Sequence, residues 1–271
     1  MKAFKFILVI LSVFLFGYLQ NNAQSVISRQ SKAKTTATEK KHVSSQKNVS
    51  KKSKKLGSNS QTNKNKSKAQ PITISAPDGY INGHGYVNLG LPSGTKWATC
   101  NIGANSPQND GNYYAWGETS INSNYTISAC RAYDIDELTK SSKALTEKMC
   151  EGNNLKPSHD AARVNWGSLW EMPTCAQITE LIEKCIWTWI TYKGNKGYRV
   201  VGPNGKSIFL PAAGFKSGTS LEWYNELGDY LSSTFNGRCN VTLKFDSINA
   251  PHCFMHSSFR SNGSSVRPVH P

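Results

Sequence analysis

Ser207–Gly218, with the sequence SIFLPAAGFKSG, is the stretch that decides the fold. Its apolar run Ile208–Leu210 is short and is followed by Pro211, which predicts a strand buried on both faces. Tyr198–Val201 is a second β-rich run, and Pro203-Asn204-Gly205 between the two runs has the residues of a tight turn. The sequence therefore predicts a hairpin at the centre of the domain, with aromatic segments packed around it.

The N-terminus has the composition of an export signal. Met1–Lys5 is basic, and the apolar run Phe6–Leu19 is shorter than the about 20 residues that a membrane span needs. Asn21-Asn22-Ala23 then offers a small residue for cleavage. This pattern predicts a signal peptide over residues 1–23, with an uncleaved signal anchor as the alternative. We expect an exported protein, located in the periplasm, at the cell surface or outside the cell.

Most of the charge lies in residues 24–70. The chain has a formal net charge of +15. Residues 24–70 hold 12 Lys and Arg29 against Glu39, which leaves about +1 for residues 71–271 once Lys2 and Lys5 are set aside. This Lys-rich segment lacks Phe, Trp and Tyr, which predicts a disordered tether. Adhesion of the segment to anionic envelope surfaces is the alternative, and no specific nucleic-acid partner is predicted for the folded part.

Residues 71–271 are long enough for one domain and carry all the cysteines. There are seven, at positions 100, 130, 150, 175, 185, 239 and 253. Export permits disulfides, but an odd number leaves at least one thiol without a partner in the chain, and the sequence does not choose among pairings.

Two more segments of this domain have readable patterns. Tyr86–Leu91 and Thr95–Cys100 flank Pro92-Ser93-Gly94, which predicts a hairpin with Trp97 on its buried face. Tyr113–Thr119 is dense in aromatic residues, which is typical of core, with a sugar-stacking platform as the alternative.

The clearest helix follows Thr174. Thr174 and Gln177 predict an N-cap with a capping box. The apolar residues that follow recur at helical spacing and form one stripe: Ile178, Leu181, Ile182 and Cys185. This stripe predicts that Cys185 is a buried thiol and not a reactive one. Pro157–Arg163 predicts a short helix capped by Ser158, and Asp134–Met149 has a weak helical pattern within a long insertion.

The C-terminal region contains two expected strands. In the first, Val241, Leu243 and Phe245 are predicted to face inward, and Thr242 and Lys244 outward. The second contains Val266 and Val269 on either side of Arg267. A buried Arg requires a partner, and Asp229 and Asp246 are the candidates.

Short motifs in the chain do not assemble a reaction centre. Gly202–Ser207 has the wrong spacing for a phosphate-binding loop and fits a hairpin turn. His252–His256 contains soft metal ligands without a second cluster, and Asp134, Asp136 and Glu137 lack the other residues of a calcium loop. No HExxH or GxSxG occurs. The sequence favours a non-enzymatic function and predicts no metal or cofactor.

Five motifs occur in the order found in one known family. They are YVNLGLPSGTKWATCNIGA at 86–104, YAWGET at 114–119, WEMPT at 170–174, SIFLPAAG at 207–214 and SVRPV at 265–269. In this order the chain, over roughly residues 80–271, resembles the Fibrobacter succinogenes major paralogous domain family. That family is similar to C-type-lectin-like folds and, more remotely, to sulfatase-modifying domains.

The resemblance implies a mixed α+β domain whose chain ends come together, and it implies no established activity. Some members resemble the variable proteins of diversity-generating retroelements, in which a segment before the closing Val-Arg motif carries the ligand face. Here that segment is about Tyr230–Asn262. The Glu-Pro-Asn and Trp-Asn-Asp signatures of calcium lectins are absent. Cys239 and Cys253 do not have the spacing of the copper ligands in sulfatase-modifying oxidases.

We therefore expect an exported, surface-displayed binding module for a glycan or protein ligand. The alternatives are a structural cell-envelope protein and a copper-dependent oxidase of the sulfatase-modifying type. Rigid aromatic residues and polar neighbours in the C-terminal part form the expected contact set. These residues are Trp223, Tyr224, Tyr230, Phe235, Arg238, Asn240, Lys244, His252, Phe254 and His256.

Overall fold

The predicted central hairpin is confirmed. The computed structural model describes residues 73–130, 148–235, 240–254 and 260–271, with the backbone alone for 252–254. Strands β8 (Asn195–Val201) and β9 (Ser207–Pro211) pair antiparallel, and all five residues of β9 are buried. The Gly202 amide donates a hydrogen bond to the Lys206 carbonyl at 2.8 Å, which closes the predicted turn. β7 (Ile186–Tyr192) pairs with the other side of β8.

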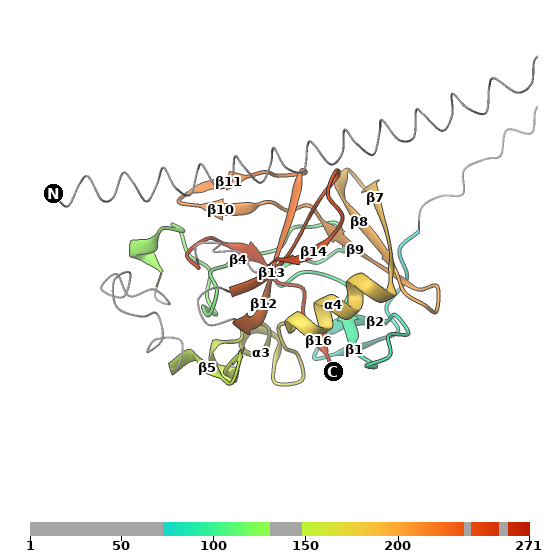
Figure 1. Ribbon diagram of the computed structural model, residues 1–271, viewed down its shortest axis with the longest axis horizontal. Helices are drawn as coiled ribbons and strands as arrows, with labels where there is room; N and C mark the ends of the chain where they lie inside the picture. The colour runs from blue at the N-terminus through green and yellow to red at the C-terminus, as the bar shows by residue number, and fades with distance from the viewer. Residues whose placement is uncertain (1–72, 131–147, 236–239, 255–259) are drawn as a thin grey trace, which may run out of the picture. The chain divides into compact units, whose positions relative to one another are not determined.

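A second sheet joins the two ends of the domain (Figure 1). Its strand order is β1-β2-β3-β16, and its strands are β1 (Gly79–Ile81), β2 (His84–Asn88), β3 (Lys96–Ala98) and β16 (Val269–His270). β2 and β3 form the hairpin predicted around Pro92-Ser93-Gly94, and Trp97 is 1% exposed. Val269 lies opposite Trp97. The last strand therefore completes the sheet that the first strands begin.

The largest sheet has seven strands. Its order is β14-β13-β12-β15-β4, with β6 beside β12 and β5 beside β6. The strands are β4 (Tyr113–Tyr114), β5 (Cys150–Glu151), β6 (Asn154–Leu155), β12 (Leu227–Phe235), β13 (Asn240–Asp246), β14 (His252–Phe254) and β15 (Ser264–Ser265). A separate two-stranded ribbon consists of β10 (Phe215–Ser217) and β11 (Ser220–Glu222).

Both faces of the β12–β13 hairpin are covered. Tyr230, Leu243 and Phe245 belong to one core cluster with the apolar stripe of the long helix. Leu231 belongs to a second cluster, and Thr242 lies opposite Leu231 in the strand register. The inward positions of β13 are confirmed, but the outward prediction for Thr242 is wrong, since Thr242 is fully buried. A strand in the middle of a sheet that is covered on both sides has no solvent face.

The expected long helix is α4 (Cys175–Lys184), and its capping box is present. The Gln177 amide donates to Thr174 Oγ1 at 3.2 Å, and the Thr174 amide donates to Gln177 Oε1 at 2.8 Å. Ile178 and Leu181 are fully buried, and α4 packs on β12, β13 and β14 (Figure 1). Cys185 lies just after α4 and is only partly buried, so the prediction of a fully buried thiol is wrong. Its partial burial still raises the pKa of the thiol to about 11, which favours the unreactive protonated form.

The short helix near Pro157 differs from its prediction. A 3-10 turn, η3 (Pro157–His159), precedes the helix α3 (Ala161–Trp166), and the cap is Asp160 and not Ser158. One Asp160 oxygen accepts the amides of Ala162 and Arg163 at 2.8 and 3.0 Å. Its second oxygen accepts the Met172 amide at 2.9 Å. Asp160 was missed because its third bond comes from a distant part of the chain.

The partners of Arg267 also differ from prediction. Arg267 is 1% exposed, and its guanidinium bonds neutral oxygens in place of a carboxylate. The acceptors are Asn101 Oδ1 at 2.8 Å and the carbonyls of Ala98, Thr99 and Phe209 at 3.1, 2.9 and 2.9 Å. Asp229 pairs with Lys244 at 3.2 Å, and Asp246 caps its own turn. The predicted single strand around Arg267 is replaced by the two short strands β15 and β16.

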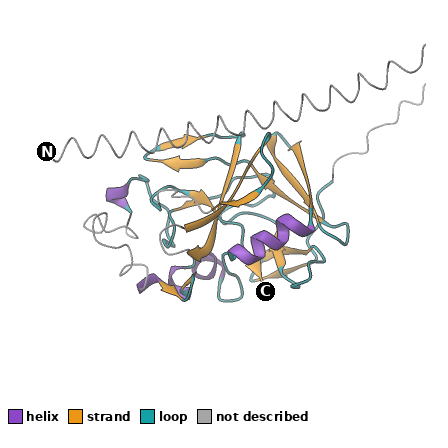
Figure 2. Cartoon of the chain, viewed as in Figure 1, coloured by secondary structure: helices purple, strands orange, loops and turns teal. Residues whose placement is uncertain are grey.

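The described residues thus form a mixed α+β domain that is mainly β (Figure 2). One further 3-10 turn, η1 (Ile127–Ala129), lies outside the sheets. The predicted signal peptide and linker, the weak helix over most of Asp134–Met149 and its acidic group lie outside the described residues. Within the described residues no helix is long and apolar enough to cross a membrane.

The first prediction concerns the observed helix cap. We expect Asp160→Ala to lower the free energy of unfolding by about 3 kcal/mol, because it removes the cap and leaves the buried Met172 amide without its acceptor. Ser158→Ala, at the exposed position that the sequence favoured, should change it by less than about 0.5 kcal/mol. Urea denaturation of both variants measures the difference, and equal effects would contradict the assignment.

The second prediction concerns the buried guanidinium. Arg267→Met should lower the free energy of unfolding by about 3 kcal/mol or more, because it leaves several buried oxygens without donors. Arg199 is the matched control, since it is partly exposed and its Nε donates to the Thr73 carbonyl at 3.1 Å. Arg199→Met should lose about 1 kcal/mol or less in the same denaturation experiment.

Candidate functional site

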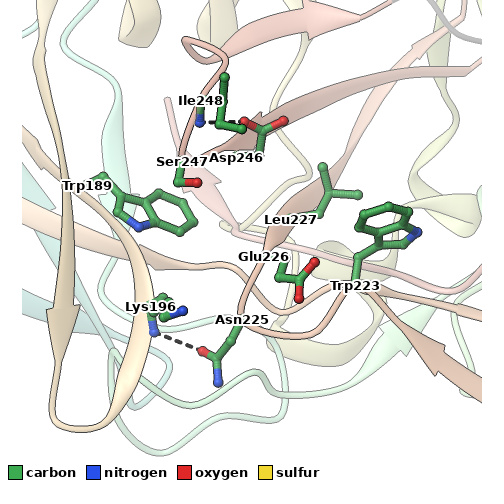
Figure 3. A pocket seen from close by; sticks show the side chains of 9 residues that line it. All are labelled: Trp189, Lys196, Trp223, Asn225, Glu226, Leu227, Asp246, Ser247 and Ile248. Carbon is green, nitrogen blue, oxygen red and sulfur yellow. Dashed lines mark hydrogen bonds between the residues drawn. The ribbon is translucent and has the colours of Figure 1, made fainter.

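A pocket of about 570 Å³ opens beside the ends of β12 and β13 (Figure 3). Its walls come from the β7–β8 hairpin, from the turn between β11 and β12, and from the segment that follows β13. The lining residues are Trp189, Lys196, Trp223, Asn225, Glu226, Leu227, Asp246, Ser247 and Ile248. This volume lies within the range of about 300–1,000 Å³ that is usual for small-ligand sites.

Two indoles lie on opposite sides of the pocket (Figure 3). Trp189 belongs to β7 and is half-buried, and its ring packs edge-on against Tyr198 at a centroid distance of 5.2 Å. It also makes an edge contact with Phe245 at 6.5 Å. Trp223 is 60% exposed. One indole is therefore fixed by the core, and the other is presented to solvent by a turn.

The turn that carries Trp223 is strained. Trp223 and Asn225 have φ values of 56° and 60°, in the left-handed region that side chains other than glycine rarely adopt. The turn is held by bonds to neighbouring segments, since the Asn225 amide donates to the Ala212 carbonyl and Asn225 Oδ1 accepts the Lys196 amide, both at 2.8 Å. Backbone strain of this kind persists only where the surrounding structure maintains it. It is concentrated at active sites and ligand-binding sites.

The rim of the pocket is charged and polar. Glu226 and Lys196 are exposed, and Asn225 is half-buried between the two walls. The Asp246 carboxylate accepts the amides of Ile248 and Asn249 at 2.7 and 2.6 Å, which fixes the segment after β13. Ile248 is 90% exposed above the pocket. The pocket therefore combines flat apolar walls with donors and acceptors at its edge.

Tyr224 connects the strained turn to the loop before β4. Its hydroxyl donates to Asn195 Oδ1 at 3.2 Å, and Asn195 Nδ2 donates to the Gln108 carbonyl at 2.6 Å. Asp110 in the same loop interacts with the Tyr224 hydroxyl, and burial raises the pKa of its carboxyl to about 6. The conformation of the turn is thus linked to a carboxyl that titrates near neutral pH.

Those expected contact residues whose side chains the structure describes do not form one surface. Trp223 lines the pocket, and Tyr224 is 41% exposed next to it. Lys244 is half-buried, where it pairs with Asp229. Arg238 and His256 lie outside the described residues, and the structure gives only the backbone of His252 and Phe254, in β14.

Three of the expected contact residues belong to the interior. Tyr230, Phe235 and Asn240 are 2%, 7% and 1% exposed. The Tyr230 hydroxyl donates to the Pro211 carbonyl at 2.7 Å. Side chains this buried do not reach a ligand at the surface, so the contact set is corrected to exclude them. The aromatic residues of 113–119 are buried as well, which supports their assignment to the core.

Sequence reasoning missed most of the pocket. Trp187 and Trp189 alternate around Thr188, which predicts a strand, and β7 confirms it, but this alternation does not indicate that the second ring reaches a pocket. Glu226 and Ile248 carry no motif. Asn225, just after β11, is the residue whose type points locally to a turn with positive φ, because Asn tolerates positive φ better than most residues.

A second pocket of about 500 Å³ lies on the sheet that joins the chain ends, and none of the expected contact residues lines it. His84 stacks on Trp166 there at a centroid distance of 3.7 Å, and burial lowers the pKa of His84. In the described part of the chain, no group of three or more His, Cys, Asp or Glu side chains is placed to hold a metal ion.

Comparison of the chain with protein-family models, with curated proteins and with solved structures finds no match.

The strain at Trp223 predicts an unusual stability difference. The free energy of unfolding should be about 1 kcal/mol larger for Trp223→Gly than for Trp223→Ala, because glycine adopts a positive φ without steric cost. Neither variant should lose much core, since the side chain is 60% exposed. Denaturant titration of the two variants tests this, and an equal or reversed order would show that the turn does not constrain φ.

The burial of Asp110 predicts a pH dependence of stability. A carboxyl with a raised pKa stabilises the native state at low pH, and this contribution is lost as the pH rises from about 4 through about 6. Asp110→Asn should therefore flatten this part of the profile and raise the free energy of unfolding at pH 7.5 by about 1 kcal/mol, a value discounted for partial exposure.

Asp78 provides the control for the Asp110 experiment. Its hydrogen bond with Lys206 lowers the pKa of the Asp78 carboxyl, so its contribution has the opposite sign and is lost as the pH falls. Asp78→Asn should leave the loss of stability between pH 4 and 6 unchanged or make it steeper. A wild-type profile in Asp110→Asn would contradict the assignment.

Proposed function

We propose that the chain is an exported ligand-binding module and that the pocket between Trp189 and Trp223 is its ligand site. The observation that carries the proposal is the exposed Trp223, held at positive φ opposite a second indole over a pocket. Rigid aromatic side chains provide large contact areas with little loss of conformational entropy, which is why they dominate binding sites.

The arrangement of the chain supports this function. The N-terminal pattern is typical of export, and the Lys-rich segment 24–70 suits a tether that connects a displayed domain to an anionic envelope. We further propose a C-type-lectin-like fold related to the Fibrobacter succinogenes major paralogous domains. The order of the five motifs and the pairing of β3 with β16 at the chain ends support this relationship.

A binding screen tests the proposal. The full chain is applied to arrays of glycans and of host and envelope proteins, with and without EDTA, at low salt and at 0.5 M salt. We expect a ligand that is retained at high salt, because charge effects of the Lys-rich segment are then screened. Trp223→Gly should weaken this binding by about tenfold or more, which corresponds to about 1.4 kcal/mol.

The matched control is Tyr80→Ala, which removes an aromatic ring that is 69% exposed and lies outside this pocket. It should bind as the wild type does. A folded protein that retains no ligand on any array contradicts a binding function and favours a structural role in the cell envelope.

A further inference from the structure

The walls of the pocket are flat and apolar. Trp189 and Trp223 present their rings from opposite sides, with Leu227 between them (Figure 3). Trp189 is braced by Tyr198 and Phe245, so its orientation is preset by the core. A ligand that fits this space needs apolar faces of about the size of an aromatic ring.

The rim requires a ligand with many hydrogen-bonding groups of both kinds. Asn225 Oδ1 is occupied by the Lys196 amide, and the Asn225 side chain also bonds the Tyr224 hydroxyl, so one N–H of Nδ2 is left to donate to a ligand. The Glu226 carboxylate accepts, the Lys196 ammonium donates, and both are exposed at the rim. Hydroxyl groups donate and accept, so a polyhydroxylated ligand satisfies all of these groups.

The rim charges disfavour other ligand classes. A quaternary ammonium ion would gain from the two indoles and Glu226, but Lys196 opposes its charge. An anionic ligand would be repelled by the carboxylates of Glu226 and Asp246, which line the pocket. A neutral ligand avoids both conflicts.

From this combination we infer that the pocket binds a chain of neutral pyranose sugars. The inference rests on the proposed binding function and specifies its ligand class. A pyranose ring has C–H faces that pack on the indoles and an equator of hydroxyls that reaches Asn225, Glu226 and Lys196. The volume of about 570 Å³ accommodates more than one ring, and the open rim suits a site along an oligosaccharide.

The test uses the full chain and a panel of neutral tetrasaccharides built from glucose, mannose, galactose or N-acetylglucosamine. Titration calorimetry and indole fluorescence are measured at 0.15 and 0.5 M salt, with choline, a sialylated oligosaccharide and lysine-rich peptides as competing classes. We expect at least one neutral tetrasaccharide to bind, with an affinity that changes less than twofold with salt.

Variants connect this binding to the pocket. Trp223→Gly should weaken it by about tenfold or more, and Glu226→Gln and Lys196→Met by about three- to tenfold each. Tyr80→Ala should leave it unchanged. Trp223→Gly is a suitable variant because glycine suits the backbone at this position, so lost binding does not reflect lost folding.

The outcomes separate the inference from the proposed function. If the arrays show a protein or charged ligand that depends on Trp223 while no neutral sugar binds, the binding function stands and the saccharide inference is overturned. Sugar binding that is insensitive to the Trp223, Glu226 and Lys196 variants overturns the assignment to this pocket. The absence of any ligand for the folded protein overturns both.

Discussion

The Arg267 guanidinium is the interaction on which the arrangement of the sheets depends. It comes from the end of the chain and bonds the end of β3, the loop residue Asn101 and the middle of β9. Two sheets are thereby fixed to each other by one side chain. Burial lowers the pKa of Arg267, yet a planar group with several fixed donors can satisfy several carbonyls at once, which Lys could not do.

With this contact in place, the remaining architecture follows from burial. The β12–β13 hairpin lies between two core clusters, one built on α4 and one that contains Trp116 and Trp170. Most of the described side chains in these two strands are consequently buried. The pocket is formed where the chain enters β12 and leaves β13, at the ends of these covered strands. The candidate site thus lies at the edge of the core. The Trp189 indole packs against core residues, and the Trp223 indole is exposed to solvent.

The features that the sequence predicted well are those set by neighbouring residues. The α4 capping box spans four residues, and the burial of β9 follows from a short apolar run that ends in proline. The prediction failed where distant segments decide the outcome. Asp160 is selected as a cap because it also binds Met172, and Thr242 is buried because another layer covers it. The pocket was hidden for the same reason, since Trp189 and Trp223 meet only through tertiary structure.

The pairing of β16 with β3 has a consequence for how the domain is made. The bond between Arg267 and the Ala98 carbonyl joins residues 169 positions apart, and Val269 pairs with Trp97 at a similar separation. Because contacts of this range form slowly, the sheet of β1, β2, β3 and β16 closes only when β16 has reached β3 across the whole domain.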